Sequence, residues 1–188
     1  MLRLPKFEVK NPTSVEEAVA MMHEIDGEAR FLAGGTDLNP NMKHKLFEPE
    51  RVVALNGIEE LSGVEVAADG SVRIGAMTTL TTVAEHAGLQ DAFAALSQAA
   101  RLVSGPQLRN MGTLGGNVML DTRCQWYNQT YFWRKALGWC MKKDGTKCHV
   151  VEGGSKCVAA ASNDTAPACG ERVPASGRPA ASQSVRTG

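Results

Sequence analysis

Phe31-Leu32-Ala33-Gly34-Gly35-Thr36-Asp37-Leu38 is the stretch that says most about the fold of this chain. A short apolar run, typical of a buried strand, ends in two consecutive glycines. Consecutive glycines allow positive φ and let a ligand approach the backbone amides closely. A row of such amides can hold a phosphate or pyrophosphate, although a tight structural turn is the plainer alternative. The spacing is not that of a Rossmann or Walker motif, so neither nucleotide-binding fold is predicted.

A second glycine loop, Gly112-Thr113-Leu114-Gly115-Gly116-Asn117, follows about 80 residues later. It could offer its amides to a ligand in the same way, or form a structural turn. Between and around the two loops the hydrophobic pattern predicts an α+β fold. The expected elements are a helix after the capping box Ser14/Glu17, strands at 30–33 and 51–55, a hairpin of 64–67 and 71–74 around Asp69-Gly70, and helices at 79–86 and 91–103.

The composition argues against some classes of partner. The chain has 188 residues, with 20 Lys plus Arg against 20 Asp plus Glu and a formal net charge of zero. A general nucleic-acid or anionic-membrane binder would normally be basic, so neither is expected. No apolar run approaches the roughly 20 residues that span a bilayer, and the N-terminus lacks the apolar stretch of a secretory signal. We therefore expect a cytoplasmic protein with reduced thiols.

Four of the five cysteines lie in one 34-residue stretch with the spacing Cys124-x15-Cys140-x7-Cys148-x8-Cys157. Four thiols at close range indicate a metal or an iron–sulfur cluster in a reducing compartment, or disulfides in an oxidising one. Structural zinc sites favour cysteine pairs two to four residues apart, and ferredoxin-type clusters favour ligands separated by two residues. Neither spacing occurs here, so spacing alone allows a metal without naming it.

The same stretch is crowded with aromatic residues, because six of the ten in the chain fall within Trp126–Trp139. Aromatic bulk would exclude water from a redox centre and tune its potential, or would simply form a small core. The four lysines within Lys135–Lys147 could offset thiolate charge or meet an acidic donor, but such lysines more often form a solvated face. His149 is expected to be a surface or hydrogen-bonded residue rather than a ligand, since four cysteines already suffice.

Together, the two glycine loops resemble the paired FAD motifs of the molybdenum hydroxylase flavoprotein subunits, the family of xanthine dehydrogenase and carbon monoxide dehydrogenase medium subunits. The resemblance runs from about Phe7 to about Ala168. It implies the α+β FAD-binding fold of the vanillyl-alcohol-oxidase (PCMH) type, with two small α/β subdomains at 1–57 and 58–168. The implied FAD contacts are Phe31, Leu32, Ala33, Gly34, Gly35, Thr36, Asp37, Leu38, Thr113, Gly115, Gly116, Asn117 and Asp164. For Asp164, the alternative is an exposed loop carboxylate without a role in FAD binding.

The cysteine segment, at about 122–160, resembles an insertion of the 4-hydroxybenzoyl-CoA reductase β subunits. The matching residues are 121–130, Cys140, Cys148-His149-Val150-Val151, Gly153-Gly154 and Cys157. The resemblance implies a 4Fe–4S cluster whose ligands are Cys124, Cys140, Cys148 and Cys157. A ferredoxin-like donor would reduce the cluster, and electrons would pass through FAD to 2Fe–2S and molybdenum-cofactor subunits of the same complex.

The resemblance further implies an oxidoreductase subunit that does not itself bind the aromatic substrate. The complex would reductively dehydroxylate 4-hydroxybenzoyl-CoA to benzoyl-CoA in anaerobic aromatic degradation. No catalytic base or nucleophile is expected in this chain, because the chemistry belongs to the cofactors. The alternatives are the FAD subunit of another molybdenum hydroxylase, a zinc-stabilised module without a redox role, and an inactive fragment.

The last 20 residues, Cys169 to Gly188, differ in character. Ala, Ser, Gly, Pro and Arg fill 14 of the 20 positions, and large apolar residues other than Val are absent. Such a composition predicts disorder, because little apolar surface can be buried. The family pattern ends after Ala168, which leads to the hypothesis of a truncated or frameshifted gene product. Cys169 would then be an accidental free thiol, and loss of later family residues would weaken FAD binding.

Overall fold

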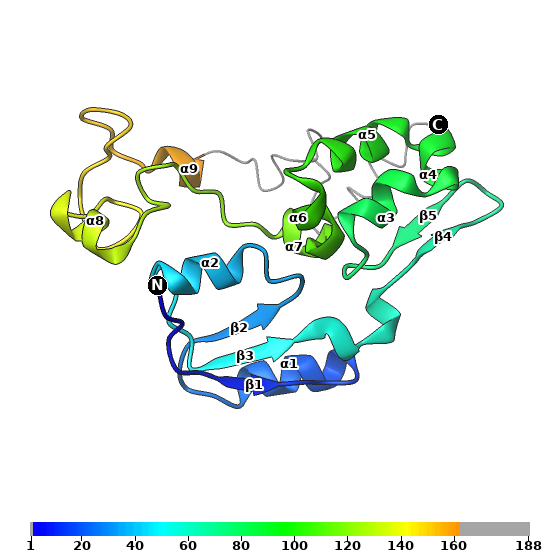
Figure 1. Cartoon of the computed structure of the whole chain (residues 1–188), viewed down its shortest axis with the longest axis horizontal. Coiled ribbons are helices and arrows are strands. Elements are labelled where there is room, and N and C mark those ends of the chain that lie inside the picture. Colours follow the sequence, from blue (N-terminus) through cyan, green and yellow to red (C-terminus); the bar gives the residue numbers. More distant parts are fainter. Residues whose placement is uncertain (1, 162–188) are drawn as a thin grey trace.

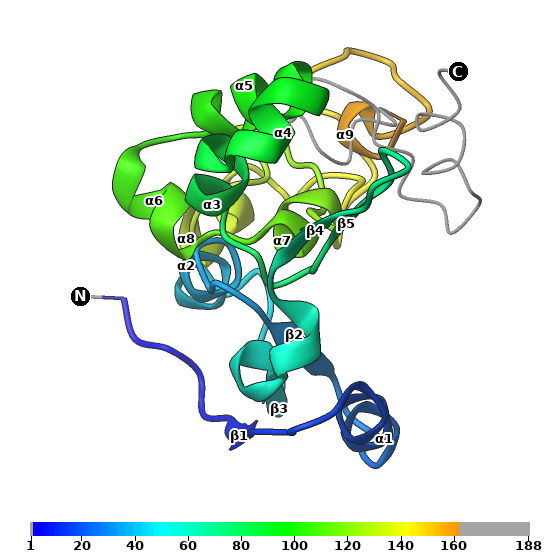
Figure 2. The same ribbon diagram turned by 90° about the vertical axis from the view of Figure 1, so that its right-hand side faces the viewer.

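A three-stranded parallel sheet forms the N-terminal part of the molecule. In the computed structural model, which describes residues 2–161, its strands are β1 (Glu8–Lys10), β2 (Ala29–Leu32) and β3 (Arg51–Ala54), in the order β1-β3-β2. Helix α1 (Val15–His23) connects β1 to β2, and α2 (Leu38–Lys43) connects β2 back to β3. The two connections run in opposite directions across the sheet, so right-handed crossovers place the helices on opposite faces, as Figures 1 and 2 show.

Both faces of this sheet are therefore packed. Val52 and Val53 are adjacent in β3, project to opposite faces and are both buried. Val53 packs with Ala18 of α1 and with Ile58 beyond the strand. On the opposite face lies α2, whose Met42 is fully buried. An alternating polar pattern is absent from β3 because neither face meets water.

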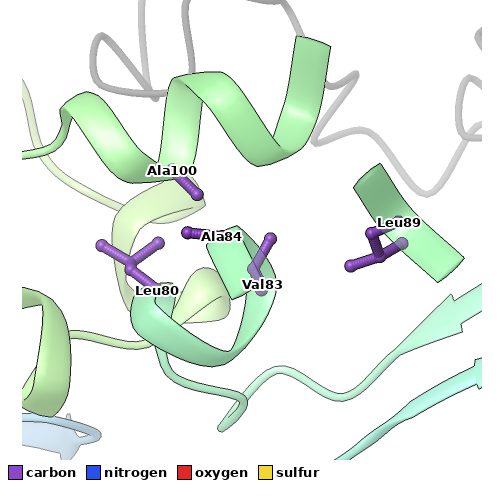
Figure 3. Close-up of a cluster of buried hydrophobic side chains, with 5 residues drawn as sticks. All are labelled: Leu80, Val83, Ala84, Leu89 and Ala100. Carbon is purple, nitrogen blue, oxygen red and sulfur yellow. The ribbon is translucent and has the colours of Figure 1, made fainter. Parts of the chain in front are cut away.

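The second half of the molecule is a hairpin followed by short helices. Two 3-10 turns, η1 (Leu55–Gly57) and η2 (Glu59–Leu61), lead from β3 into the antiparallel strands β4 and β5. Helices α3 to α5 enclose the main cluster of buried side chains, Leu80, Val83, Ala84, Leu89 and Ala100 (Figure 3). The bounds are β4 Val64–Val66, β5 Val72–Ile74, α3 Leu80–Glu85, α4 Ala87–Ala92, α5 Ala94–Leu102, α6 Pro106–Met111 and α7 Leu114–Val118.

Several expected elements are confirmed. The Ser14 side chain accepts the N–H of Glu17 at 3.1 Å, so α1 begins at the predicted cap. The Glu17 carboxylate accepts the N–H of Thr13 at 2.7 Å, one residue before the position that a standard capping box uses. The hairpin forms around Gly70, which has φ +83°, but its connection spans 67–71 rather than two residues.

Other elements differ from expectation. The helix expected at 91–103 is two helices, α4 and α5, separated by Phe93 with φ −137° and ψ 54°. Helix α6, which was not among the expected elements, begins with Pro106 directly after Gly105, and proline at the first helical position is a start signal present in the sequence. The glycines of the second loop lie partly inside α7, because the Thr113 hydroxyl caps that helix.

The cysteine segment extends from the end of α7 and contains α8 (Tyr131–Ala136) and α9 (Val158–Ala161). Figure 1 shows it at one end of the molecule, reached by a chain that passes along α2. None of the helices in residues 2–161 is long and apolar enough to cross a membrane. Asp164, Cys169 and the tail expected to be disordered lie outside the described residues.

Candidate functional site

The fold brings the two glycine loops into direct contact. A Cβ atom added to Gly34 would overlap the carbonyl oxygen of Met111 and lie 3.1 Å from the Cα of Gly112. A Cβ on Gly116 would lie 3.7 Å from the Cβ of Ala33. The two backbones therefore touch without side chains between them, and even alanine at Gly34 would push them apart. Segments about 80 residues apart in sequence thus form one site.

The first glycine loop (Gly34–Asp37) lies at the carboxyl end of β2, the edge of a parallel sheet where ligands bind in open α/β folds. Gly35 has φ +71°, a conformation that favours glycine. Within residues 2–161, the backbone N–H groups of Gly34, Gly35 and Thr36 donate to no protein acceptor. Three unpaired N–H groups in one turn are suited to the oxygens of a phosphate or pyrophosphate.

The second glycine loop (Gly112–Asn117) is different, because the protein itself uses its amides. Gly115 donates its N–H to the carbonyl of Ala76 at 2.8 Å, and Gly116 donates to the hydroxyl of Thr113 at 3.1 Å. The N–H groups of Leu114 and Asn117 also have acceptors, the carbonyls of Thr78 and Thr113. Of the two alternatives for this loop, residues 114–117 therefore follow the structural one, because their amides are already paired.

These glycines instead allow close packing against a third segment, 76–79, that sequence reasoning missed. A Cβ on Gly115 would lie 2.7 Å from the Cβ of Ala76. Thr79 and Thr113 form a β-bridge, and the buried Thr78 hydroxyl donates to the carbonyl of Gly63 at 2.9 Å. The segment contains no glycine, so its only local signal was the Thr79 hydroxyl that caps α3.

Asp37 joins the first glycine loop to the cysteine segment. Its two carboxylate oxygens accept hydrogen bonds from both terminal nitrogens of Arg123, one of them at 3.1 Å, and Oδ2 also accepts from Asn41 at 2.9 Å. The Arg123 side chain is only 10% exposed. Its Nε is buried and has no partner within residues 2–161. We did not predict Arg123, although it directly precedes Cys124.

Further cations of the cysteine segment bind backbone carbonyls rather than water. The buried Arg134 donates to the carbonyl of Lys45 at 2.9 Å, and Lys143 donates to that of Leu46 at 2.8 Å. Lys142 pairs with Asp121 at 2.6 Å. The expected solvated lysine face is therefore wrong for Lys142 and Lys143, whereas Lys135 and Lys147 are exposed.

The four cysteines are free thiols, of which Cys148 is buried and the others are partly exposed. The backbone N–H groups of Val151, Val150 and Val158 donate to the Cys148 sulfur and lower the pKa of its thiol. Four thiols are the donor set that zinc or an iron–sulfur cluster prefers. Yet no three Cys, His, Asp or Glu side chains within residues 2–161 are gathered closely enough to hold a metal.

Only some of the aromatic residues of the segment form a small core, because Phe132 and Trp133 are exposed whereas Tyr127 is buried. Tyr131 and Trp139 meet edge to face with ring centroids 5.2 Å apart, and the Arg134 guanidinium lies over the Trp139 ring. His149 Nε2 donates to the carbonyl of Trp139 at 2.7 Å, so this histidine is hydrogen-bonded as expected. A hollow of about 10 Å³, room for about one water, is lined by Trp126, Arg134, Leu137, Trp139, Cys140, Lys143 and His149.

Comparison with known proteins identifies the family of this domain. The family model described as the FAD binding domain in molybdopterin dehydrogenase matches residues 5–170. The chain belongs to this family. It is an FAD-binding member of the molybdenum hydroxylase oxidoreductases, and the expected α+β FAD-binding fold is confirmed.

Two curated relatives and two solved structures illustrate the relationship. The chain is 41% identical over 115 residues to the carbon monoxide dehydrogenase medium chain of Hydrogenophaga pseudoflava, covering 61% of this chain and 39% of that one. It is 33% identical over 165 residues to the aldehyde oxidoreductase FAD-binding subunit PaoB of Escherichia coli (strain K12), covering 85% and 51%. It therefore spans between about two-fifths and one-half of these relatives.

The structural neighbours agree. Carbon monoxide dehydrogenase from Hydrogenophaga pseudoflava, in a form lacking the Mo-pyranopterin moiety, aligns with TM-score 0.61 and 38% identity, over 64% of this chain and 42% of the other. Quinoline 2-oxidoreductase from Pseudomonas putida 86 aligns with TM-score 0.60 and 28% identity, over 64% and 41%. At 38% and 28% identity, both structures resemble this chain in sequence as well as in fold.

Proposed function

We propose that this chain is an electron-transfer subunit that holds FAD at the two glycine loops and a 4Fe–4S cluster in its cysteine segment. The observation that carries the FAD site is the contact between the loops, at which Gly34, Gly35 and Thr36 keep unpaired N–H groups within the described residues. FAD would supply the redox chemistry, and the protein would bind and orient it. The proposed two-subdomain division at residue 57 belongs to this interpretation.

In this proposal each loop has its own task. The first loop would bind the pyrophosphate through its free amides, and 31–33, the end of β2 and the residue after it, would support the loop. The second loop would allow close approach through Gly115 and Gly116, with Thr113 as the helix cap. Asp37 would act through Arg123 rather than on the cofactor directly. Leu38, Asn117 and Asp164 complete the proposed set, the last outside the described residues.

The cluster is proposed on the chemistry of its donors. Cys124, Cys140, Cys148 and Cys157 are all reduced, and the amides around Cys148 favour its thiolate, the form that ligates metals. The thiols do not form a metal-binding group in the arrangement described, so the segment would have to close around the cluster. Coupling of that kind is common, because small metal sites often become ordered only with the metal.

We further propose that the subunit works beside 2Fe–2S and molybdenum-cofactor subunits, takes electrons from a ferredoxin-like donor in the cytoplasm, and serves reductive dehydroxylation of 4-hydroxybenzoyl-CoA. The resemblance of the cysteine segment to the insertion of the 4-hydroxybenzoyl-CoA reductase β subunits supports that substrate. A second candidate is a subunit of an aldehyde oxidoreductase. The alignment with PaoB covers 85% of 188 residues, about 160, and any continuous stretch of that length includes Cys124 to Cys157. The segment therefore does not by itself select one substrate.

Anaerobic purification followed by iron, sulfide, zinc and flavin quantitation tests the cofactors. We expect about one FAD and about four irons per chain. Cys140→Ser should lose the iron and keep the flavin, while the matched change Cys169→Ser, outside the segment, should keep both. Stoichiometric zinc without iron, or normal iron in Cys140→Ser, would contradict the cluster. With its partner subunits, the complex should consume 4-hydroxybenzoyl-CoA when reduced; aldehyde oxidation instead would select the second candidate.

A further inference from the structure

We infer that the cysteine segment is a clamp on helix α2 that presets the first glycine loop for FAD, with Arg123 as the positioning residue at its centre. The inference rests on the proposed FAD site and goes beyond it. It assigns the segment a second role, independent of any cluster, and makes FAD affinity depend on residues that lie outside both glycine loops.

Three cationic side chains of the segment form hydrogen bonds at the two ends of α2. Arg123 binds Asp37 at the N-terminal end, through a two-pronged pairing. Arg134 and Lys143 bind the carbonyls of Lys45 and Leu46, just past the C-terminal end. The carbonyls of Pro40, Asn41 and Met42 already accept backbone N–H groups, so these two cations hold the turn that follows α2. Figures 1 and 2 show the segment lying alongside α2 in both views.

These contacts with α2 matter because the first glycine loop has few hydrogen bonds of its own. Asp37 occupies the cap position of α2 but makes no side-chain cap hydrogen bond; its carboxylate is committed to Arg123 and Asn41 instead. The N–H groups of Gly34 to Thr36 have no protein acceptor in the described part of the chain. The position of these amides is therefore set by β2 before them, by α2 after them and by the contact of Gly34 with Met111 and Gly112. The cysteine segment acts on the second of these, α2.

Arg123 is well suited to carry this coupling. Its side chain is 10% exposed and that of Asp37 is 42% exposed, and a two-pronged arginine–carboxylate pair fixes the relative geometry of its partners as well as adding energy. Its Nε is buried and unpaired within residues 2–161, and an unpaired buried donor is costly. An anion bound beside the loop would lower that cost. By linkage, an ordered segment then strengthens FAD binding, and bound FAD orders the segment to the same extent.

The test measures the FAD dissociation constant by flavin fluorescence in the purified full chain. We expect Asp37→Asn and Arg123→Gln each to weaken FAD binding about tenfold or more, and the double variant to lose little beyond either single change. The charge-swapped pair Asp37→Arg with Arg123→Asp should recover part of the affinity. Arg73→Gln is the matched control, because its ion pair with Glu65 is exposed; it should change the constant less than about twofold.

Lys143→Met provides a second variant that keeps the apolar stem and lies at the opposite end of α2, so it should fold and weaken FAD binding by a smaller factor. FAD should also slow amide hydrogen exchange across 122–157 in the wild type and less so in Arg123→Gln. If the wild type binds no FAD, the proposed function fails. If it binds FAD and both Arg123→Gln and Lys143→Met bind equally well, the clamp is overturned while the function stands.

Discussion

Gly34 shows how one missing side chain can decide the geometry of a site. The carbonyl of Met111 occupies the space that a Cβ would take, and backbone cannot turn aside as a side chain can. Gly35 is constrained differently, by its φ of +71° and by the side-chain nitrogen of Asn39, which would lie 2.8 Å from an added Cβ. The two neighbouring glycines therefore serve distinct physical purposes, close approach and backbone direction.

We predict that Gly34→Ala separates the two glycine loops. Overpacking of this kind typically costs about 1–3 kcal/mol of folding stability, and FAD affinity should fall more than stability does. Urea unfolding and FAD titration would measure the two effects. Gly88→Ala is the control, because its nearest neighbour is the tip of the Val66 side chain and alanine favours the helix. Unchanged FAD binding in Gly34→Ala would contradict the proposed role of the loop contact in FAD binding.

At the scale of elements, short helices are held by caps and packing rather than by length. Helix α7 has five residues and two glycines, so little intrinsic preference supports it. It forms because the Thr113 hydroxyl accepts the N–H of Gly116 and because Leu114 and Gly115 donate to the 76–79 segment. The cap thus holds the second loop in the position where it meets the first.

We predict that Thr113→Val lowers the free energy of unfolding by about 1 kcal/mol through loss of the cap and also weakens FAD binding. Ser14→Ala removes the cap of α1, where the hydroxyl accepts the N–H of Glu17 at 3.1 Å. Its effect on FAD binding should be much smaller, since α1 carries no proposed FAD contact and no contact of the clamp. Chemical denaturation and flavin fluorescence on both variants make the comparison; equal losses of FAD affinity would argue against the special role of α7.

At the scale of the whole molecule, two separate cores are joined where the loops meet. One cluster surrounds Val53 in the N-terminal sheet, and the other surrounds Val83 among α3 to α5. A ligand that touches both loops would therefore hold both halves in one arrangement. Binding to the folded state alone raises stability in proportion to the logarithm of ligand concentration.

We predict that FAD at about a hundred times its dissociation constant stabilises the chain by about 2.7 kcal/mol, a rise in melting temperature of roughly 5–10 °C. ADP, which carries the adenosine–pyrophosphate half, should give a smaller rise, and riboflavin, which lacks that half, should give little. Thermal unfolding followed by circular dichroism would measure all three. A rise with riboflavin that matches FAD, or none with ADP, would place the binding determinants elsewhere.

Local signals in the sequence determined much of the architecture. The capping box at Ser14, the hairpin at Gly70 and the glycine-ended strand before Gly34 act over a few residues, so a one-dimensional pattern contains them. The break at Phe93 did not follow from periodicity, because α4 and α5 each cover the same buried cluster and the pattern runs on through the break. The family resemblance of the two loops also needed only sequence.

Tertiary structure alone decided which groups are free and which are paired. Sequence treats the two glycine loops alike, yet within residues 2–161 the fold leaves the amides of Gly34 to Thr36 open and occupies those of 114–117. Sequence likewise reads Arg123 and Lys143 as ordinary charges, whereas the fold places their partners, Asp37 and the carbonyl of Leu46, beside them. Hydrogen bonds between residues 86 and 97 positions apart depend on how strands and helices pack, and no local pattern records that packing.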